Sequence, residues 1–203
     1  MSLDLAQLAA IAAALGWASG LRLYAVVFLT GAAGYLGWIE LPPGLQILQH
    51  PLVLAASFVF FAIEFVADKI PGVDTVWDAV HTVIRIPAGA ALAAGVFGGD
   101  SATWALLAAL MGGTLAATAH AAKATTRAAV NTSPEPLSNV ALSLAGDAAV
   151  PALLWLAWTH PVWFWPALGV AVAVALVLLA VLFRFLRGLW RRFAGGPTRV
   201  ARA

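Results

Sequence analysis

Long apolar segments, separated by short turns, constrain the fold of this chain more than any other feature. Residues 5–38 form an apolar run of 34 residues, and residues 161–186 form a second one. A helix needs about 20 apolar residues to cross the hydrocarbon core of a bilayer, so runs of this length are typical of membrane spans. Of all residues 63% are hydrophobic and only 10% are charged. We therefore predict an all-α, polytopic membrane protein with about five to seven membrane segments.

Some of these segments contain residues that interrupt helices. As one helix, residues 5–38 would be about 51 Å long against a hydrocarbon core of about 30 Å, so we expect a break within residues 17–22. A second break is predicted at Gly112–Gly113. Residues 73–98 are predicted to divide at Pro87 into an amphipathic helix and a half-helix. Further spans are predicted over residues 51–68 and 137–158.

The chain is predicted to form a single transmembrane domain over residues 1–190, followed by a basic tail over residues 191–203. The sequence AALGWASG around Gly16 is echoed by AALMGG around Gly112. A span that starts with proline and holds one deep carboxylate follows each, Glu64 in the first case and Asp147 in the second. These parallels predict two halves, residues 1–98 and 99–190, related as an inverted repeat with a binding site between them.

Charged side chains in the apolar segments are expected to pair internally, line a water-filled cavity or take part in chemistry. Each raises the free energy of membrane insertion by about 2.5–3.5 kcal/mol at the centre of a helix. Glu64 and Asp68 share one helix face, and with Asp147 they are predicted to relay a proton or cation. A set of basic and amide side chains is predicted to bind a carboxylate or phosphate, with internal pairing to the acids as the alternative. This set is Arg22, Arg85, His120, Lys123, Arg127, Asn131 and Asn139.

The amphipathic segment also offers a candidate metal site. Asp74, Asp78 and His81 follow at positions i, i+4 and i+7, which places two carboxylates and an imidazole on one helix face. Such a set can hold a divalent cation. The alternative is a helix that lies at the membrane edge and turns this polar face towards water. Apart from this metal ion, no cofactor is expected.

Four stretches of this sequence together resemble a known family. They are SGLRLY at residues 19–24, KIPGVDTVWDAVHTVIRIPAGA at 69–90, AHAAKATTRAAVN at 119–131 and NTSPEPLSNVALSLAGD at 131–147. The chain resembles bacterial integral membrane proteins grouped as domain-of-unknown-function family 4126. The resemblance covers nearly the whole chain and implies a multi-span helical membrane protein. It implies no activity.

We expect the protein to be a transporter or lipid-headgroup translocase for a small anionic substrate, coupled to a proton or cation, in the bacterial inner membrane. Two alternatives stay open: an intramembrane metal-dependent enzyme acting on a lipid phosphate, and a structural or assembly subunit without a substrate. No phosphatase or CDP-alcohol transferase motif is recognisable, so transport is favoured over catalysis. The expected partners are membrane lipid and the anionic solute or headgroup. Self-association is left open, and nucleic acid is not expected.

The basic residues after the last apolar run generate a prediction of topology. Six arginines lie at the end of that run or after it, and positive charge beside a span is retained in the cytoplasm, so we predict a cytoplasmic C-terminus. A C-terminal reporter that works only on the periplasmic side should stay inactive, and an active one would contradict the prediction. The arginines are Arg184, Arg187, Arg191, Arg192, Arg199 and Arg202.

Overall fold

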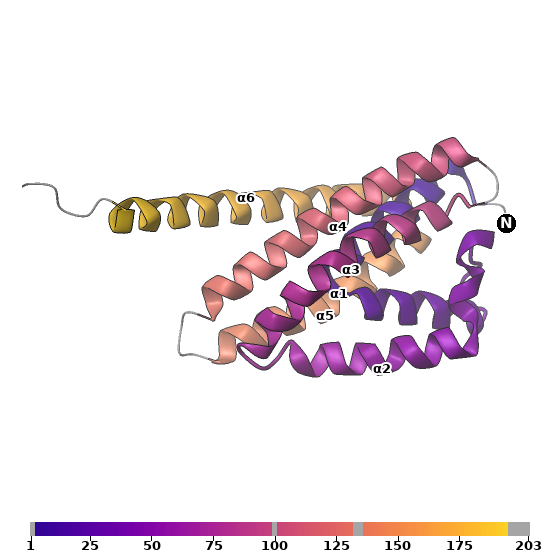
Figure 1. Ribbon diagram of the computed structural model, residues 1–203. Coiled ribbons are helices and arrows are strands. Elements are labelled where there is room, and N and C mark those ends of the chain that lie inside the picture. Colours follow the sequence, from indigo (N-terminus) through magenta and orange to yellow (C-terminus); the bar gives the residue numbers. More distant parts are fainter. Residues whose placement is uncertain (1–2, 99–100, 132–135, 195–203) are drawn as a thin grey trace, which may run out of the picture.

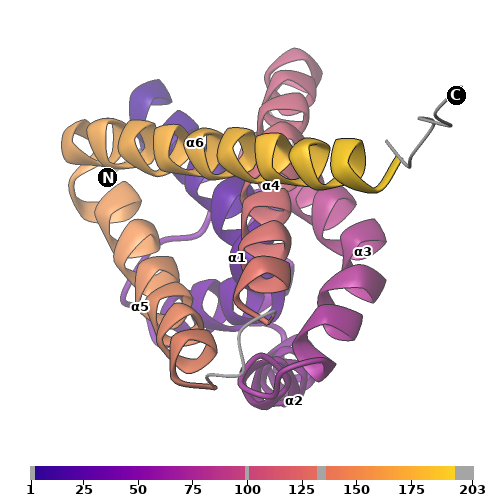
Figure 2. The same ribbon diagram turned by 90° about the vertical axis from the view of Figure 1, so that its left-hand side faces the viewer.

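One buried helix lies at the centre of the structure, and the other helices surround it. A computed structural model of the chain describes residues 3–98, 101–131 and 136–194, and every regular element in these ranges is a helix. Figure 2 shows α1 between α5 on one side and α3 on the other, with α6 crossing above and α2 below. The helices are α1 (Leu5–Tyr35), η1 (Pro43–Gln49), α2 (Pro51–Ala67), α3 (Val73–Gly95), α4 (Ala102–Val130), α5 (Pro136–Thr159) and α6 (Pro161–Ala194).

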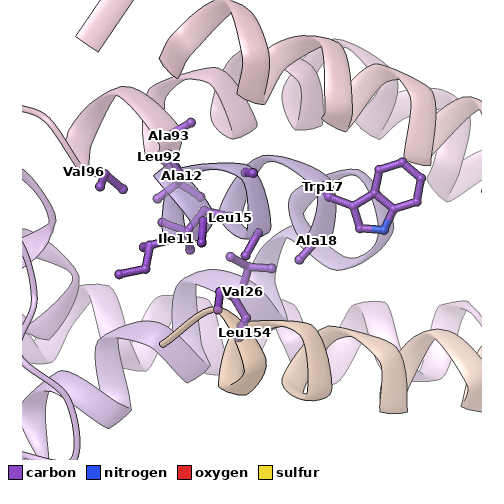
Figure 3. Close-up of a cluster of buried hydrophobic side chains, with 14 of the residues drawn as sticks. Ile11, Ala12, Leu15, Trp17, Ala18, Val26, Leu92, Ala93, Val96 and Leu154 are labelled. Carbon is purple, nitrogen blue, oxygen red and sulfur yellow. The ribbon is translucent and has the colours of Figure 1, made fainter. Parts of the chain in front are cut away.

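Helix α1 forms the core because it is apolar on all sides. Every residue from Ala10 to Gly20 is buried, as expected for a helix without a polar face. Figure 3 shows Ile11 and Leu15 of α1 among buried side chains of other helices, including Leu92 of α3 and Leu154 of α5. The core therefore joins the N-terminal helix to later parts of the chain.

Glycines bring α1, α3 and α4 into close contact. A Cβ atom added at Gly16 in α1 would lie 2.5 Å from the Cα atom of Gly112 in α4. One added at Gly112 would in turn lie 2.8 Å from the carbonyl oxygen of Gly89 in α3. Small residues at such crossings let helix backbones approach closely. The predicted break at Gly112–Gly113 is therefore wrong: α4 is continuous, and these glycines serve packing.

The predicted break in the first apolar run is confirmed. Arg22 has non-helical backbone angles, with φ at −149° and ψ at 82°, and it divides α1 into two parts. The second part of α1 ends at Tyr35. The side chain at the break is a buried arginine, so the interruption occurs where a charge enters the protein interior.

Helix α3 differs from its prediction in two ways. It continues through Pro87 as one helix, because neighbouring helices can compensate for the hydrogen bond that a proline removes. Its polar face points inward and its apolar face outward, since Val76 and Val80 are 66% and 57% exposed. The helix therefore does not turn its polar face towards water at a membrane edge. The buried polar side chains are Asp74, Asp78, His81 and Arg85.

Several helices are long and apolar enough to cross a membrane. In the described residues these candidate spans are α1, α4, Leu137–Thr159 in α5 and Pro161–Phe185 in α6. Helices η1 and α2, bent by 70° at the break between them, are either a fifth, broken span or a re-entrant loop. The predicted spans over residues 51–68 and 137–158 correspond to α2 and α5. The protein is thus a polytopic helical membrane protein.

The C-terminal end of α6 extends beyond the other helices (Figure 1). Residues 191–194, predicted to begin the basic tail, continue this helix. The remainder of the predicted tail, residues 195–203, lies outside the described residues.

The glycine contacts generate the first structural prediction. Gly16→Val should force α1 and α4 apart and lower the free energy of unfolding by about 1–3 kcal/mol, the usual effect of overpacking. Gly169→Val is the matched control, because a Cβ atom at Gly169 meets no atom within 4 Å. Thermal unfolding in detergent measures both variants. Equal melting temperatures would contradict the packing role of Gly16.

Candidate functional site

Ten charged side chains form one network in the interior of the helical bundle. Five are cations and five are carboxylates, so their charges balance. The cations include every lysine and arginine that precedes the six C-terminal arginines. Pairing of this kind reduces the cost of charge in a membrane protein. The members are Arg22, Lys69, Arg85, Lys123 and Arg127, with Glu64, Asp68, Asp74, Asp78 and Asp147.

Asp68 is the centre of the network. It follows the last residue of α2 and contacts three cations: Arg22, Lys123 at 2.9 Å and Arg127 at 2.6 Å. Burial alone would raise the pKa of Asp68, but these three cations outweigh burial and lower the pKa to about 2. Asp68 is therefore ionised, and its cationic partners come from α1 and α4.

Arg85 forms a second centre in α3. Its two terminal nitrogens lie 2.6 Å from an oxygen of Glu64 and 2.7 Å from an oxygen of Asp78. Nδ1 of His120 lies 3.1 Å from Arg85, and Nε2 of the same ring lies 2.7 Å from the hydroxyl of Thr82. Arg85 thus joins α2 and α4 to α3.

The break in α1 allows Arg22 to reach α5. Nη2 of Arg22 donates to the carbonyl and hydroxyl oxygens of Ser143, at 3.1 and 2.9 Å. Nε lies 2.8 Å from Oδ1 of Asp147, whose other oxygen accepts from Lys69 at 3.0 Å. Next to the break, Lys123 donates to the carbonyl oxygen of Leu21 at 2.9 Å. Arg22 and Lys123 therefore tie the broken part of α1 to α5 and α4.

The network brings together most of the predicted site residues. The amide of Asn131 joins it by donating to Asp74 at 2.9 Å. His81 and Asn139 are not drawn in. His81 contacts the hydroxyl of Tyr24 and the carbonyl oxygen of Trp77, and the side-chain amide of Asn139 is buried without a hydrogen-bond partner among the described residues.

The predicted metal ligands do not converge. Asp74 accepts from Asn131 and from donors of Gly72 and Thr75 at the start of α3. Asp78 faces cations, and His81 faces Tyr24. Within the ranges that the structure describes, no group of three or more His, Cys, Asp or Glu side chains is arranged to hold a metal ion. The metal hypothesis for these three residues thus has no support from their geometry.

Three members of the site were missed by the predicted set. Lys69 pairs with Asp147, Thr82 contacts His120, and Ser143 accepts from Arg22. Helical spacing carries a signal for two of them, because Thr82 follows Asp78 by four residues and Ser143 precedes Asp147 by four. The pairing of Lys69 depends on the tertiary fold and has no such signal.

A cavity of about 330 Å³ lies beside the network. All four helices that contain complete candidate spans contribute to its wall: α1, α4, α5 and α6. Arg22, Lys123 and Arg127 line one part, whereas most other lining residues are alanine, glycine, leucine or valine. The cavity therefore has three cations in an otherwise largely apolar wall.

The position of Asp68 at the centre of the network predicts how strongly its substitution lowers stability. Asp68→Asn should lower the free energy of unfolding by about 3–5 kcal/mol, because it leaves buried cations without their shared counter-charge. Asp147→Asn should lower the free energy of unfolding by less, since the Asp147 side chain is 16% exposed and Arg22 retains its contact with Asp68.

The stabilisation by Asp68 also depends on pH. Because the pKa of folded Asp68 lies below its ordinary value, this stabilisation is complete above about pH 4 and is lost as pH falls towards 2. Unfolding in detergent across this range measures both effects; an equal loss in the two variants would contradict the role of Asp68.

Comparison with known proteins identifies the family of this chain. No curated protein and no solved structure matches the chain. Residues 9–185, which include the whole charge network and the cavity, match a family described as a domain of unknown function, DUF4126. Since the match extends over most of the sequence, this chain belongs to the DUF4126 family.

Proposed function

We propose that the protein is a membrane transporter or lipid-headgroup translocase for a small anionic substrate that carries a carboxylate or phosphate. The observation that carries this proposal is the position of Arg22. It lies at the break in α1, lines the cavity, and contacts carboxylates from two different parts of the chain, Asp68 and Asp147. Arginine presents a planar fork that matches carboxylate and phosphate groups.

In the proposed mechanism, the substrate competes with Asp147 for Arg22. Asp147 holds Arg22 through one oxygen and Lys69 through the other. A proton on Asp147 would weaken both contacts and free donors of Arg22 for an anion, and loss of that proton would expel the anion. Glu64 and Asp68 are the other members of the proposed proton or cation relay: Glu64 contacts Arg85, and Asp68, which stays ionised, supplies the fixed negative charge beside Arg127.

The proposal includes a relation between the two halves of the chain, residues 1–98 and 99–190. Gly16 follows the shared AAL triplet directly and Gly112 follows it one residue later, and a Cβ atom added at Gly16 would lie 2.5 Å from the Cα atom of Gly112. We propose on the basis of the repeated pattern and this contact an inverted repeat with the site between the halves, the arrangement of many secondary transporters. The location proposed for the protein is the bacterial inner membrane, with the C-terminus in the cytoplasm.

The charge balance of the network favours one competing function. Five cations paired with five carboxylates can hold helices together without any substrate, as in a structural or assembly subunit. A structural role does not explain the cavity, because helix pairing alone requires no space lined by cations. Measurements of flux separate the two.

Proteoliposomes with an imposed pH gradient test transport. The probes are labelled inorganic phosphate, labelled succinate and a fluorescent anionic phospholipid, each compared with protein-free vesicles. We expect at least one probe to move faster with the protein and to respond to the gradient. Asp147→Asn should abolish the response to the gradient, because the amide cannot take up or release the proton.

Glu40→Gln is the control variant, because Glu40 is an exposed carboxylate outside the network. It should retain flux and its dependence on the gradient. If no probe moves faster than in protein-free vesicles, the subunit without a substrate becomes the better explanation. If Asp147→Asn keeps full coupling, Asp147 is not the coupling residue.

A further inference from the structure

The cavity beside the charge network opens towards the surface of α6 that would face lipid. Val174 and Leu178 line it and are nevertheless 53% and 41% exposed. Both lie within Pro161–Phe185, the candidate span of α6. Across the cavity, Ala145 of α5 is also exposed. A molecule could therefore enter between α5 and α6 from the hydrocarbon region without crossing the aqueous phase.

The lining of the cavity is chemically asymmetric. Arg22, Lys123 and Arg127 contribute charge, and no carboxylate is among the described residues that line it. One part of the cavity wall is thus positively charged and is suited to an anionic head.

The remaining wall is suited to hydrocarbon. It consists largely of small and aliphatic side chains from α1, α4, α5 and α6, together with the ring of Trp17. A small hydrated anion gains nothing from such a surface, whereas an acyl chain is accommodated in it. The volume of about 330 Å³ lies at the lower end of the range for ligand cavities, roughly 300–1,000 Å³.

From this asymmetry we infer that the ligand of the cavity is an anionic lipid. Its phosphate or carboxylate head contacts Arg22, Lys123 and Arg127, and an acyl chain passes between α5 and α6 towards the membrane. The inference rests on the function proposed above and narrows its substrate class from small anions in general to anionic amphiphiles. Head and chain are recognised by different parts of one cavity. Free phosphate lacks the chain, and a zwitterionic lipid adds a positive charge next to three cations of the wall.

Gly146 provides a test that leaves the charge network intact. It lines the cavity, and a Cβ atom added there meets no atom within 4 Å. Gly146→Leu therefore fills the cavity without a backbone clash. Gly169→Leu is the matched control, because the same space is open at Gly169, which does not line the cavity.

The full-length protein is reconstituted in phosphatidylcholine nanodiscs with a photoactivatable phosphatidic acid or palmitic acid. Photoactivatable phosphatidylcholine and an excess of inorganic phosphate serve as comparisons. We expect an anionic probe to label the cavity segments of α5 and α6 more strongly than phosphatidylcholine does. Gly146→Leu should reduce this labelling to the level of phosphatidylcholine. Gly169→Leu and added phosphate should leave it unchanged.

Three outcomes would overturn the inference. Equal labelling by phosphatidylcholine would mean ordinary contact with surrounding lipid, full competition by inorganic phosphate would mean a site for a free anion, and unchanged labelling in Gly146→Leu would place the lipid elsewhere. Flux measurements keep the two proposals separate. Labelling without flux would support the lipid site and contradict the transport function. Flux of phosphate without lipid labelling would support transport and contradict the lipid site.

Discussion

The requirement that buried charges find partners governs this structure. A single carboxylate, Asp68, contacts cations from α1 and α4 at the point where α2 ends. Without these contacts, Arg22 and Arg127 would be buried charges with few counter-charges, which is costly in a low-dielectric interior. The break in α1, the inward polar face of α3 and the position of α2 all serve to bring these groups within reach. The apolar core packs around this neutral arrangement of charges.

Packing around the network depends on the smallest residues of the chain. The contact between Gly16 and Gly112 leaves no room for any side chain, and Gly89 adds α3 to the same crossing. Lipid offers apolar helices no hydrophobic reason to associate, so close backbone contact and polar pairing supply the attraction. The glycine crossing and the ion pairs therefore hold the same three helices together by different means.

Much of the fold follows from patterns in the sequence, and the exceptions have physical causes. Apolar length located the spans, and the excess length of the first run predicted a break within residues 17–22, which lies at Arg22. Gly112 and Pro87 were interpreted as helix breakers, but both lie within continuous helices. Their local propensities are outweighed by contacts with residues distant in sequence. In the site, helical spacing grouped carboxylates correctly along each helix, whereas partners such as Lys69 and Asp147 are set only by the tertiary arrangement.

The equal number of cations and carboxylates has an electrical consequence. A membrane potential does work of about 2.3 kcal/mol per elementary charge for each 100 mV crossed. A network with no net charge can be displaced as a unit through that field without such work, so its motion is insensitive to voltage. If a monovalent anion entered alone, network and anion together would carry one negative charge, and their motion would depend on voltage. A proton that accompanies the anion, on Asp147 or another carboxylate of the network, would restore the insensitivity and make each cycle electroneutral.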